Sequence, residues 1–418
     1  MRRFSRNFWV YLISGVFWSL GLMIFFLVYN LHLLDLGFDE ALIGRVAAAF
    51  TLGSLAVTFL TGWLLNNYGL NRVIQLWVLA TAILLPLRSL THAAWFVIIA
   101  AFLNGASIGG WMVSAPPFLT RNANLEIRAW AFSLSYGSSI GMGALAGVIV
   151  GLASRQFPDW IGAGVTAGFS GKQYVLLASS ASVLVGFLVL LFLRESAASA
   201  GAPEPPIPSI GSAKRRIWSR RFVLQLLIVL VLWSLFVGSF PPFFNVYFHK
   251  QFNQSLQGIG MIFSFSQLCQ VLAVLCMPWL ALRLGRVRAI FSMQIASALV
   301  LPALIFTSNV QLAGMVYLAY LSFQVMTEPA LENFIMDSVL PEERNTVASL
   351  RYMTLFAIQA LAVLVSGFVI AHFGYSFLLV GIAILGISAA LTFYLFFRSR
   401  AQVHAAKEST VPAACPLN

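Results

Sequence analysis

Long apolar runs recur along the whole chain, and each is close to the length of about 20 residues with which a helix crosses a membrane. Twelve of these runs are predicted to span, at residues 8–29, 41–65, 72–91, 94–118, 129–153, 173–193, 221–247, 256–281, 287–307, 312–336, 347–371 and 375–397. The runs are continuous and do not alternate at every second residue, which indicates helices and excludes a transmembrane β-barrel. We therefore expect an all-α polytopic membrane protein with twelve transmembrane helices.

The composition excludes most other classes of protein. Of the 418 residues, 60% are hydrophobic and 9% are charged, whereas a soluble domain carries about 25% charged residues. A soluble enzyme, a disordered chain and a secreted disulfide scaffold are therefore excluded, and a lipid bilayer is the expected surrounding. The net charge of +12 does not indicate a nucleic-acid partner, because basic cytoplasmic loops explain it. The sequence predicts no metal site and no cofactor.

Lysine and arginine residues are distributed unequally between the two sides of the predicted spans. With the N-terminus placed in the cytoplasm, 20 of the 25 fall on cytoplasmic segments and five on the outer side. Because cytoplasmic loops carry the excess of basic residues, this distribution predicts a multi-pass protein of a prokaryotic cytoplasmic (inner) membrane with both termini inside. Nothing in the sequence requires more than a monomer.

A change of composition divides the chain into two halves. Residues 195–219 are rich in alanine, proline and serine, which is typical of a flexible linker, here on the cytoplasmic side. The linker separates an N-terminal half of six spans, residues 1–194, from a C-terminal half of six spans, residues 220–400. Residues 401–418 are expected to form a disordered cytoplasmic tail.

The two halves are repeats of each other. A shift of 216 residues places Trp63-Leu64 on Trp279-Leu280, Gly69 on Gly285 and Glu126-x-Arg128 on Glu342-x-Arg344. These matches include loops and helix ends, so shared hydrophobicity does not explain them. A shift by six helices gives both halves the same orientation, which defines a parallel repeat. Two such halves usually hold a site between them near the membrane midplane and expose it to each side in turn.

The loop after the second span carries a motif, which reads Gly62-Trp-Leu-Leu-Asn66-Asn-Tyr-Gly69-Leu-Asn-Arg72. This motif resembles the G-x-L-a-D-r-x-G-r-k signature of the major facilitator superfamily. The repeat and the twelve predicted spans resemble the same family. The resemblance covers all twelve helices. The family's aspartate falls on Asn66, which can hydrogen-bond but cannot form the ion pair that this aspartate makes with an arginine after the fourth helix, here Arg128.

This resemblance implies two parallel six-helix halves and transport by alternating access. It also implies that the two copies of the loop, with the arginines after helices 4 and 10, belong to the cytoplasmic gate. The predicted gating residues are Gly62, Asn66, Gly69, Arg72, Arg128, Gly285, Glu332 and Arg344.

Two acidic residues, Glu328 and Glu332, fall within a predicted span, and the other eleven lie outside the spans or at their inner edges. A carboxylate is costly in the hydrocarbon interior and burial favours its protonated form, so both are candidate functional residues. Glu328 lies deeper and is predicted to carry a proton or to contact a cationic substrate group. Glu332 is predicted to pair in the cytoplasmic gate with an arginine such as Arg121 or Arg128. A structural ion pair or a protonated acid bonded between helices stays open for both.

In the major facilitator superfamily, helices 1, 4, 7 and 10 line the cavity. The resemblance therefore implies a substrate-binding wall made of Trp18, Asn104, Trp111, Trp233, Asn245, Gln324 and Glu328. Aromatic planes with a few amides suit a small amphiphilic or ring-shaped organic solute.

Prolines and arginines near the outer helix ends lead to three further predictions. Pro241-Pro242 predicts a break in the seventh helix. Arg45 and Arg88 are expected to extend to the membrane surface. Arg45 is also a candidate partner of Asp39 or Glu40 in an outer gate.

The predicted function is secondary active transport of a small organic solute across the cytoplasmic membrane, coupled to protons through Glu328, with export favoured over uptake. The sequence holds no nucleotide-binding motif, so ATP is not the expected energy source. It also holds no nucleophile–base pair that would indicate an enzyme. An uncoupled facilitator, a lipid flippase and a non-transporting sensor share this fold and stay open as alternatives.

Overall fold

The computed structural model describes residues 4–123, 125–156, 171–194, 221–339 and 344–409. Within these ranges the protein consists of helices joined by short turns, and no strand occurs in them. The α-helices are α1 (Arg6–Asp35), α2 (Glu40–Tyr68), α3 (Leu70–Leu90), α4 (Ala94–Asn122), α5 (Leu125–Gln156), α7 (Gly171–Leu190), α9 (Arg221–Ser239), α10 (Phe244–Phe252), α11 (Leu256–Leu284), α12 (Arg286–Val300), α13 (Val310–Ser338) and α14 (Arg344–Ser409). The predicted linker, 195–219, lies outside the described residues.

The described helices confirm the predicted membrane spans. Eleven segments of the described chain are long and apolar enough to cross a membrane, and the last, Val347–Arg398, is 52 residues long. Gly374 interrupts this segment with a left-handed φ of 81° and a ψ of 174°, between the predicted spans 347–371 and 375–397. The segment therefore accounts for two spans, which gives twelve. Helix α14 continues to Ser409, into the part of the chain for which a disordered tail is predicted.

Prolines and glycines place the main breaks. After α9, Pro241–Phe243 form one 3-10 turn before α10 begins, so the predicted break in the seventh span is confirmed. Proline lacks the backbone N–H that would continue the helix. Gly69 and Gly285 separate α2 from α3 and α11 from α12, each with a φ of 80°. This conformation is accessible to glycine at little cost, and its occurrence at repeat-related positions reproduces the internal symmetry.

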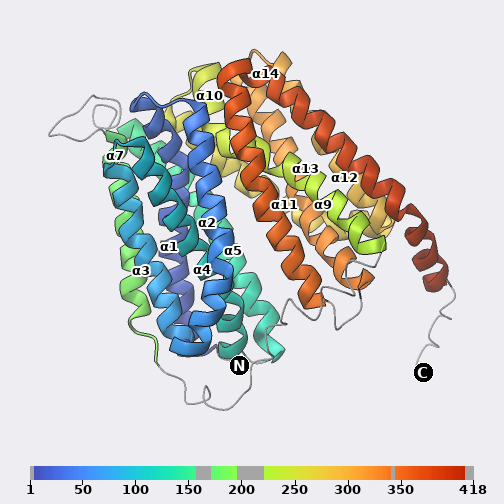
Figure 1. Ribbon diagram of the computed structural model, residues 1–418, viewed down its shortest axis with the longest axis horizontal. Helices are drawn as coiled ribbons and strands as arrows, with labels where there is room; N and C mark the ends of the chain where they lie inside the picture. Colours follow the sequence, from blue (N-terminus) through green and yellow to red (C-terminus); the bar gives the residue numbers. More distant parts are fainter. Residues whose placement is uncertain (1–3, 124, 157–170, 195–220, 340–343, 410–418) are drawn as a thin grey trace.

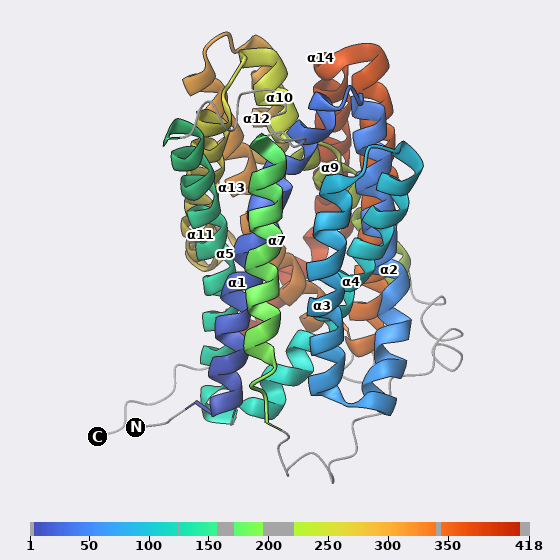
Figure 2. The same ribbon diagram turned by 90° about the vertical axis from the view of Figure 1, so that its left-hand side faces the viewer.

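Helices α1 to α7 pack on one another to form one bundle, and α9 to α14 form a second (Figures 1 and 2). The bundles touch where α2 packs on α14, α5 on α11 and α1 on α10. Figure 1 shows the bundles closest together at the end that carries α10, which we call the distal end, and further apart at the proximal end, where the N-terminus lies.

Glycines set the distance between helices in the N-terminal bundle. A methyl group on Gly105 of α4 would lie 1.8 Å from the carbonyl oxygen of Phe50 on α2. We expect Gly105→Ala to lower the free energy of unfolding by about 3 kcal/mol, because two backbones would have to separate. Thermal unfolding of the purified protein measures this. Gly137→Ala is the control, since a Cβ at Gly137 meets no atom within 4 Å; equal melting of both variants would contradict this packing.

Candidate functional site

The two membrane acids predicted from the sequence share one arginine. Arg351 of α14 donates from Nη2 to Glu328 Oε2 over 2.8 Å and from Nη1 to Glu332 Oε2. On α13 the two glutamates lie four residues apart, so they project from the same face of the helix. Trp233 of α9 donates its indole N–H to the other oxygen of Glu328 over 3.1 Å. Side chains of three helices therefore converge on Glu328.

Burial is unequal within this group. The Arg351 side chain is 6% exposed, whereas the side chains of Glu328 and Glu332 are 33% and 34% exposed. Trp233 is buried, with 1% of its surface exposed. The guanidinium and the indole therefore lie behind the carboxylates, and the acidic groups form the accessible part of the site.

Charge counting shows what this arrangement can do. Arginine stays protonated in proteins, so two ionised carboxylates and one guanidinium sum to −1, and one added proton makes the group neutral. Loss of Arg351, the partner of both carboxylates, would leave their partly buried charges uncompensated, which is costly in a membrane. The group can thus exchange one proton, or one cationic group, between a singly negative and a neutral form.

The structure pairs the carboxylate of Glu332 with Arg351, an arginine that the sequence analysis did not name as its partner. The side chain of Arg128 lies outside the described residues, so a pair between Glu332 and Arg128 stays a prediction. Sequence reasoning assigned Arg351 to the cytoplasmic arginines and passed over it as a functional residue. A signal was present, since Arg351 lies four residues inside the predicted span 347–371, and an arginine within a span requires a partner.

The predicted N-terminal wall contains a stack of aromatic rings. Trp18 of α1 and Trp111 of α4 lie 3.9 Å apart between ring centroids with an interplanar angle of 26°. Tyr11 stacks on Phe118 at 4.7 Å and on Trp111 at 6.1 Å. Trp111 is partly exposed, whereas Trp18 is buried. Of these rings, Trp111 is the one that offers a face to a solute in this conformation.

Asn104, also predicted to line the wall, is fully buried and accepts a hydrogen bond from Arg88 Nη1 over 2.8 Å. Arg88 itself is 3% exposed. The expectation that Arg88 extends to the membrane surface is therefore wrong. Its guanidinium turns into the bundle, where Asn104 and two aromatic rings receive it.

Comparison with known proteins decides the family. The sequence profile of the Major Facilitator Superfamily matches residues 7–327 and 239–415, which together span nearly the whole chain. The chain belongs to the Major Facilitator Superfamily. It is therefore a membrane transporter of a small solute and not an enzyme. None of the curated protein sequences compared with the chain matches it significantly.

Solved transporter structures share the fold of this superfamily member. The nucleoside transporter NupG aligns with a TM-score of 0.77 and 16% identity, over 94% of this chain and all of its own. A bacterial homologue of the human lysosomal transporter Spinster aligns with a TM-score of 0.73 and 13% identity, over 94% of this chain and 98% of its own. The xylose transporter XylE from E. coli aligns with a TM-score of 0.70 and 14% identity, over 93% of this chain and 94% of its own.

The loop that resembles the superfamily signature forms the turn between α2 and α3. Gly69 takes the left-handed conformation that ends α2, and Gly285 repeats it between α11 and α12. Gly62 is buried in α2, and Arg72 is exposed in the first turn of α3. The side chains of Asn66, Arg128 and Arg344 lie outside the described residues, so the gating role of these loops stays a prediction.

Asn245, predicted to bind substrate, joins the two bundles at the distal end. Its amide donates to the carbonyl oxygen of Leu27 on α1 over 2.9 Å. Asn30 donates in the opposite direction, to the carbonyl oxygen of Pro242 over 2.7 Å. Gln324 of α13 is 5% exposed, and its Oε1 has no partner in the described part of the chain. Asn245 is thus engaged between the bundles, whereas Gln324 holds a buried acceptor that is unsatisfied in the described structure.

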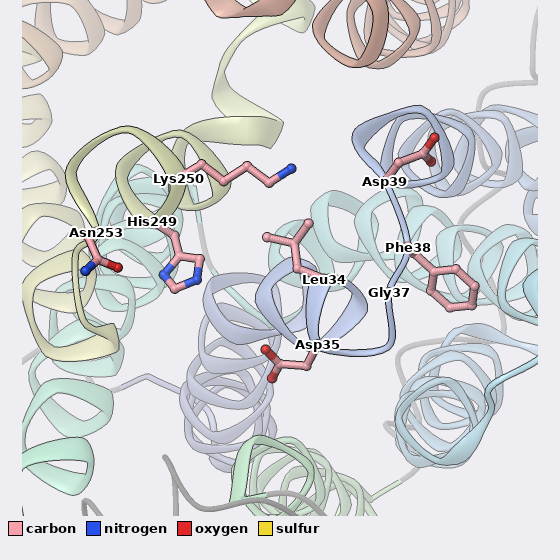
Figure 3. Close-up of a pocket in the computed structure, with 8 residues that line it drawn as sticks. All are labelled: Leu34, Asp35, Gly37, Phe38, Asp39, His249, Lys250 and Asn253. Carbon is pink, nitrogen blue, oxygen red and sulfur yellow. The ribbon is translucent and has the colours of Figure 1, made fainter.

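The distal surface carries a pocket of about 550 Å³ where the bundles meet (Figure 3). Lys250 of α10 crosses to Glu40 at the start of α2, with a distance of 2.6 Å and a carboxylate that is 7% exposed. Asp39 caps α2 by accepting from the backbone N–H of Leu42. Arg45 is predicted from the sequence to pair with Asp39 or Glu40. For Glu40 this prediction is wrong, because Glu40 pairs with Lys250 of the other bundle.

Proposed function

We propose that this protein is a proton-coupled secondary transporter of a small organic solute, in which Glu328 carries the proton. The observation that carries the proposal is the sharing of Arg351 between Glu328 and Glu332. A group with two carboxylates and one guanidinium accepts one proton without leaving an unpaired charge, as coupling requires. We assign the proton to Glu328 because it lies deeper along α13 than Glu332 and beside Trp233 of α9, a helix of the predicted cavity wall.

In transport by alternating access, the conformation of the two bundles determines to which side of the membrane the acidic group can release its proton. Glycines bring the backbones of the two bundles together at Gly44 and Gly367 and at Gly147 and Gly260. Gly44 and Gly260 lie in the first turns of α2 and α11, at the distal end (Figure 1). If the N-terminus lies in the cytoplasm, as the arginine distribution predicts, the distal end faces outward and this conformation is open inward. Glu328 then lies about 15 Å along α13 from the cytoplasmic end, at 1.5 Å per residue, where its proton can be released to the cytoplasm.

The substrate class follows from the predicted wall. Trp111 offers a partly exposed ring and Glu328 a partly exposed carboxylate, with the buried, unsatisfied acceptor of Gln324 on the same helix as Glu328. A ring-shaped polar solute, such as a nucleoside or a sugar, can stack on Trp111 and hydrogen-bond to Glu328. NupG and XylE, which are described as transporters of nucleosides and xylose, support these classes as the first to be assayed. Export stays the predicted direction.

The test uses proteoliposomes loaded with a pH-sensitive dye. Nucleosides, sugars, amino acids, organic acids and cationic drugs are added singly, on either side, and proton movement is recorded. We expect one class to move protons in the wild type and the signal to fall by at least tenfold in Glu328→Gln, because the amide cannot take up a proton. Asp337→Asn is the matched control, since Asp337 lies on the same helix in an exposed pair with Arg286.

Other outcomes overturn the proposal. Unchanged radiolabelled flux in Glu328→Gln without any proton signal would identify an uncoupled facilitator and leave Glu328 a structural acid. Redistribution of labelled lipid without movement of any soluble solute would identify a flippase. Solute binding without flux would identify a sensor.

A further inference from the structure

The N-terminal bundle holds a buried positive charge far along the chain from the acidic group just described. Arg88 lies in the last turn of α3, and only 3% of its surface is exposed. Its guanidinium carbon lies 4.2 Å from the ring centroid of Tyr29 and 5.0 Å from that of Phe25, both on α1. Its Nη1 donates to Asn104 Oδ1 over 2.8 Å. Rings and an amide oxygen attract the cation but do not neutralise it.

No counter-charge completes this group among the described residues. No described carboxylate forms an ion pair with Arg88, and the acid nearest in sequence on α1, Asp35, is paired with Lys172. Two buried donors are also left over in the described structure, namely Nε of Arg88 and Nδ2 of Asn104. Buried donors are normally hydrogen-bonded, and a buried charge normally has a charged partner. The group thus lacks an acceptor for these two donors and a negative charge.

We propose that Arg88 and Asn104 bind a small inorganic anion inside the N-terminal bundle, with chloride as the expected occupant. One anion supplies both missing features, because it accepts from several donors and neutralises the guanidinium. The near-complete burial of both residues favours a single small ion over an organic solute. Bound water would satisfy the donors but would leave the charge uncompensated.

The place of the site gives the ion a structural role. Phe25 and Tyr29, which cover the guanidinium, belong to the stretch of α1 that also carries Leu27 and Asn30. Leu27 and Asn30 make the distal contacts with the C-terminal bundle. The anion therefore stabilises the part of α1 that holds the two bundles together at the distal end. This inference does not depend on the proposed proton coupling.

The test measures thermal unfolding of the full-length purified protein in detergent, with no substrate present. Sodium chloride replaces sodium gluconate stepwise at constant ionic strength. We expect the melting temperature to rise saturably by about 2–5 °C, because a ligand that binds only the folded state stabilises it. The rise should vanish in Arg88→Gln. Arg283→Gln is the matched control, because Arg283 also lies over an aromatic ring, 4.1 Å from that of Trp279, but on the exposed surface.

A second variant keeps the test decisive if Arg88→Gln does not fold. Asn104→Asp retains the oxygen that accepts from Arg88 and brings its own negative charge. We expect it to melt in gluconate as the wild type does in chloride, and to be insensitive to chloride. A wild type that melts equally in both salts would overturn the proposal, as would a chloride effect that persists in Asn104→Asp.

Discussion

Arg351→Met is expected to abolish transport and to lower the free energy of unfolding by about 2–3 kcal/mol. The variant removes the one cation that Glu328 and Glu332 share, and it leaves two carboxylates four residues apart on α13. Breaking a fully buried ion pair costs about 3–5 kcal/mol, and the one-third exposure of both carboxylates places the expected loss below that range. Solute flux in proteoliposomes and thermal unfolding of the purified protein measure the two effects.

Further variants separate the role of the charge from that of the side chain's volume. Arg286→Met is the control for stability, because Arg286 pairs with Asp337 on the surface, where an ion pair contributes less than about 1 kcal/mol. Adding Glu328→Gln and Glu332→Gln to Arg351→Met should restore stability, since no unpaired charge remains, without restoring transport. Wild-type stability and flux in Arg351→Met alone would show that the shared arginine has no function.

Local patterns explain why most of the fold could be predicted. A run of about 20 apolar residues has few alternatives to a spanning helix, so the twelve spans follow from hydrophobicity alone. Proline and glycine act through their own backbones, which is why the break at Pro241-Pro242 and the turns at Gly69 and Gly285 could be placed to within a few residues. The repeat then defined which helices correspond.

The partners of the charged groups could not be predicted in the same way. Arg351 lies 19 residues from Glu332 and 23 from Glu328, and no periodicity within one helix relates residues on two different helices. Assigning arginines to the two sides of the membrane places Arg351 with the cytoplasmic loops and Arg88 near the outer surface. In the structure both guanidinium groups are buried within a helix bundle. The depth of a charge along a span is visible in the sequence, but its direction across the bundle depends on how the helices pack.

Gly44→Leu is expected to open the distal end. A Cβ at Gly44 would lie 2.9 Å from the carbonyl oxygen of Val363 and 3.0 Å from Cα of Gly367, so a side chain there meets the backbone of α14. Overpacking of this kind costs about 1–3 kcal/mol, and only the conformation in which α2 touches α14 bears that cost. At 1.4 kcal/mol per tenfold, the equilibrium should shift away from distal closure by about 5- to 150-fold.

The shift can be measured as the accessibility of one cysteine. Leu27→Cys places a thiol at a position that is 1% exposed beside the distal contact, in a background with Cys269, Cys276 and Cys415 replaced by serine. We expect an impermeant maleimide added outside to label it at least fivefold faster when Gly44→Leu is present. Gly381→Leu is the control on α14, since a Cβ at Gly381 meets no atom within 4 Å. Equal labelling in all three backgrounds would mean that the contact between Gly44 and Gly367 does not separate during transport, and the bundles would then have to open by bending within helices.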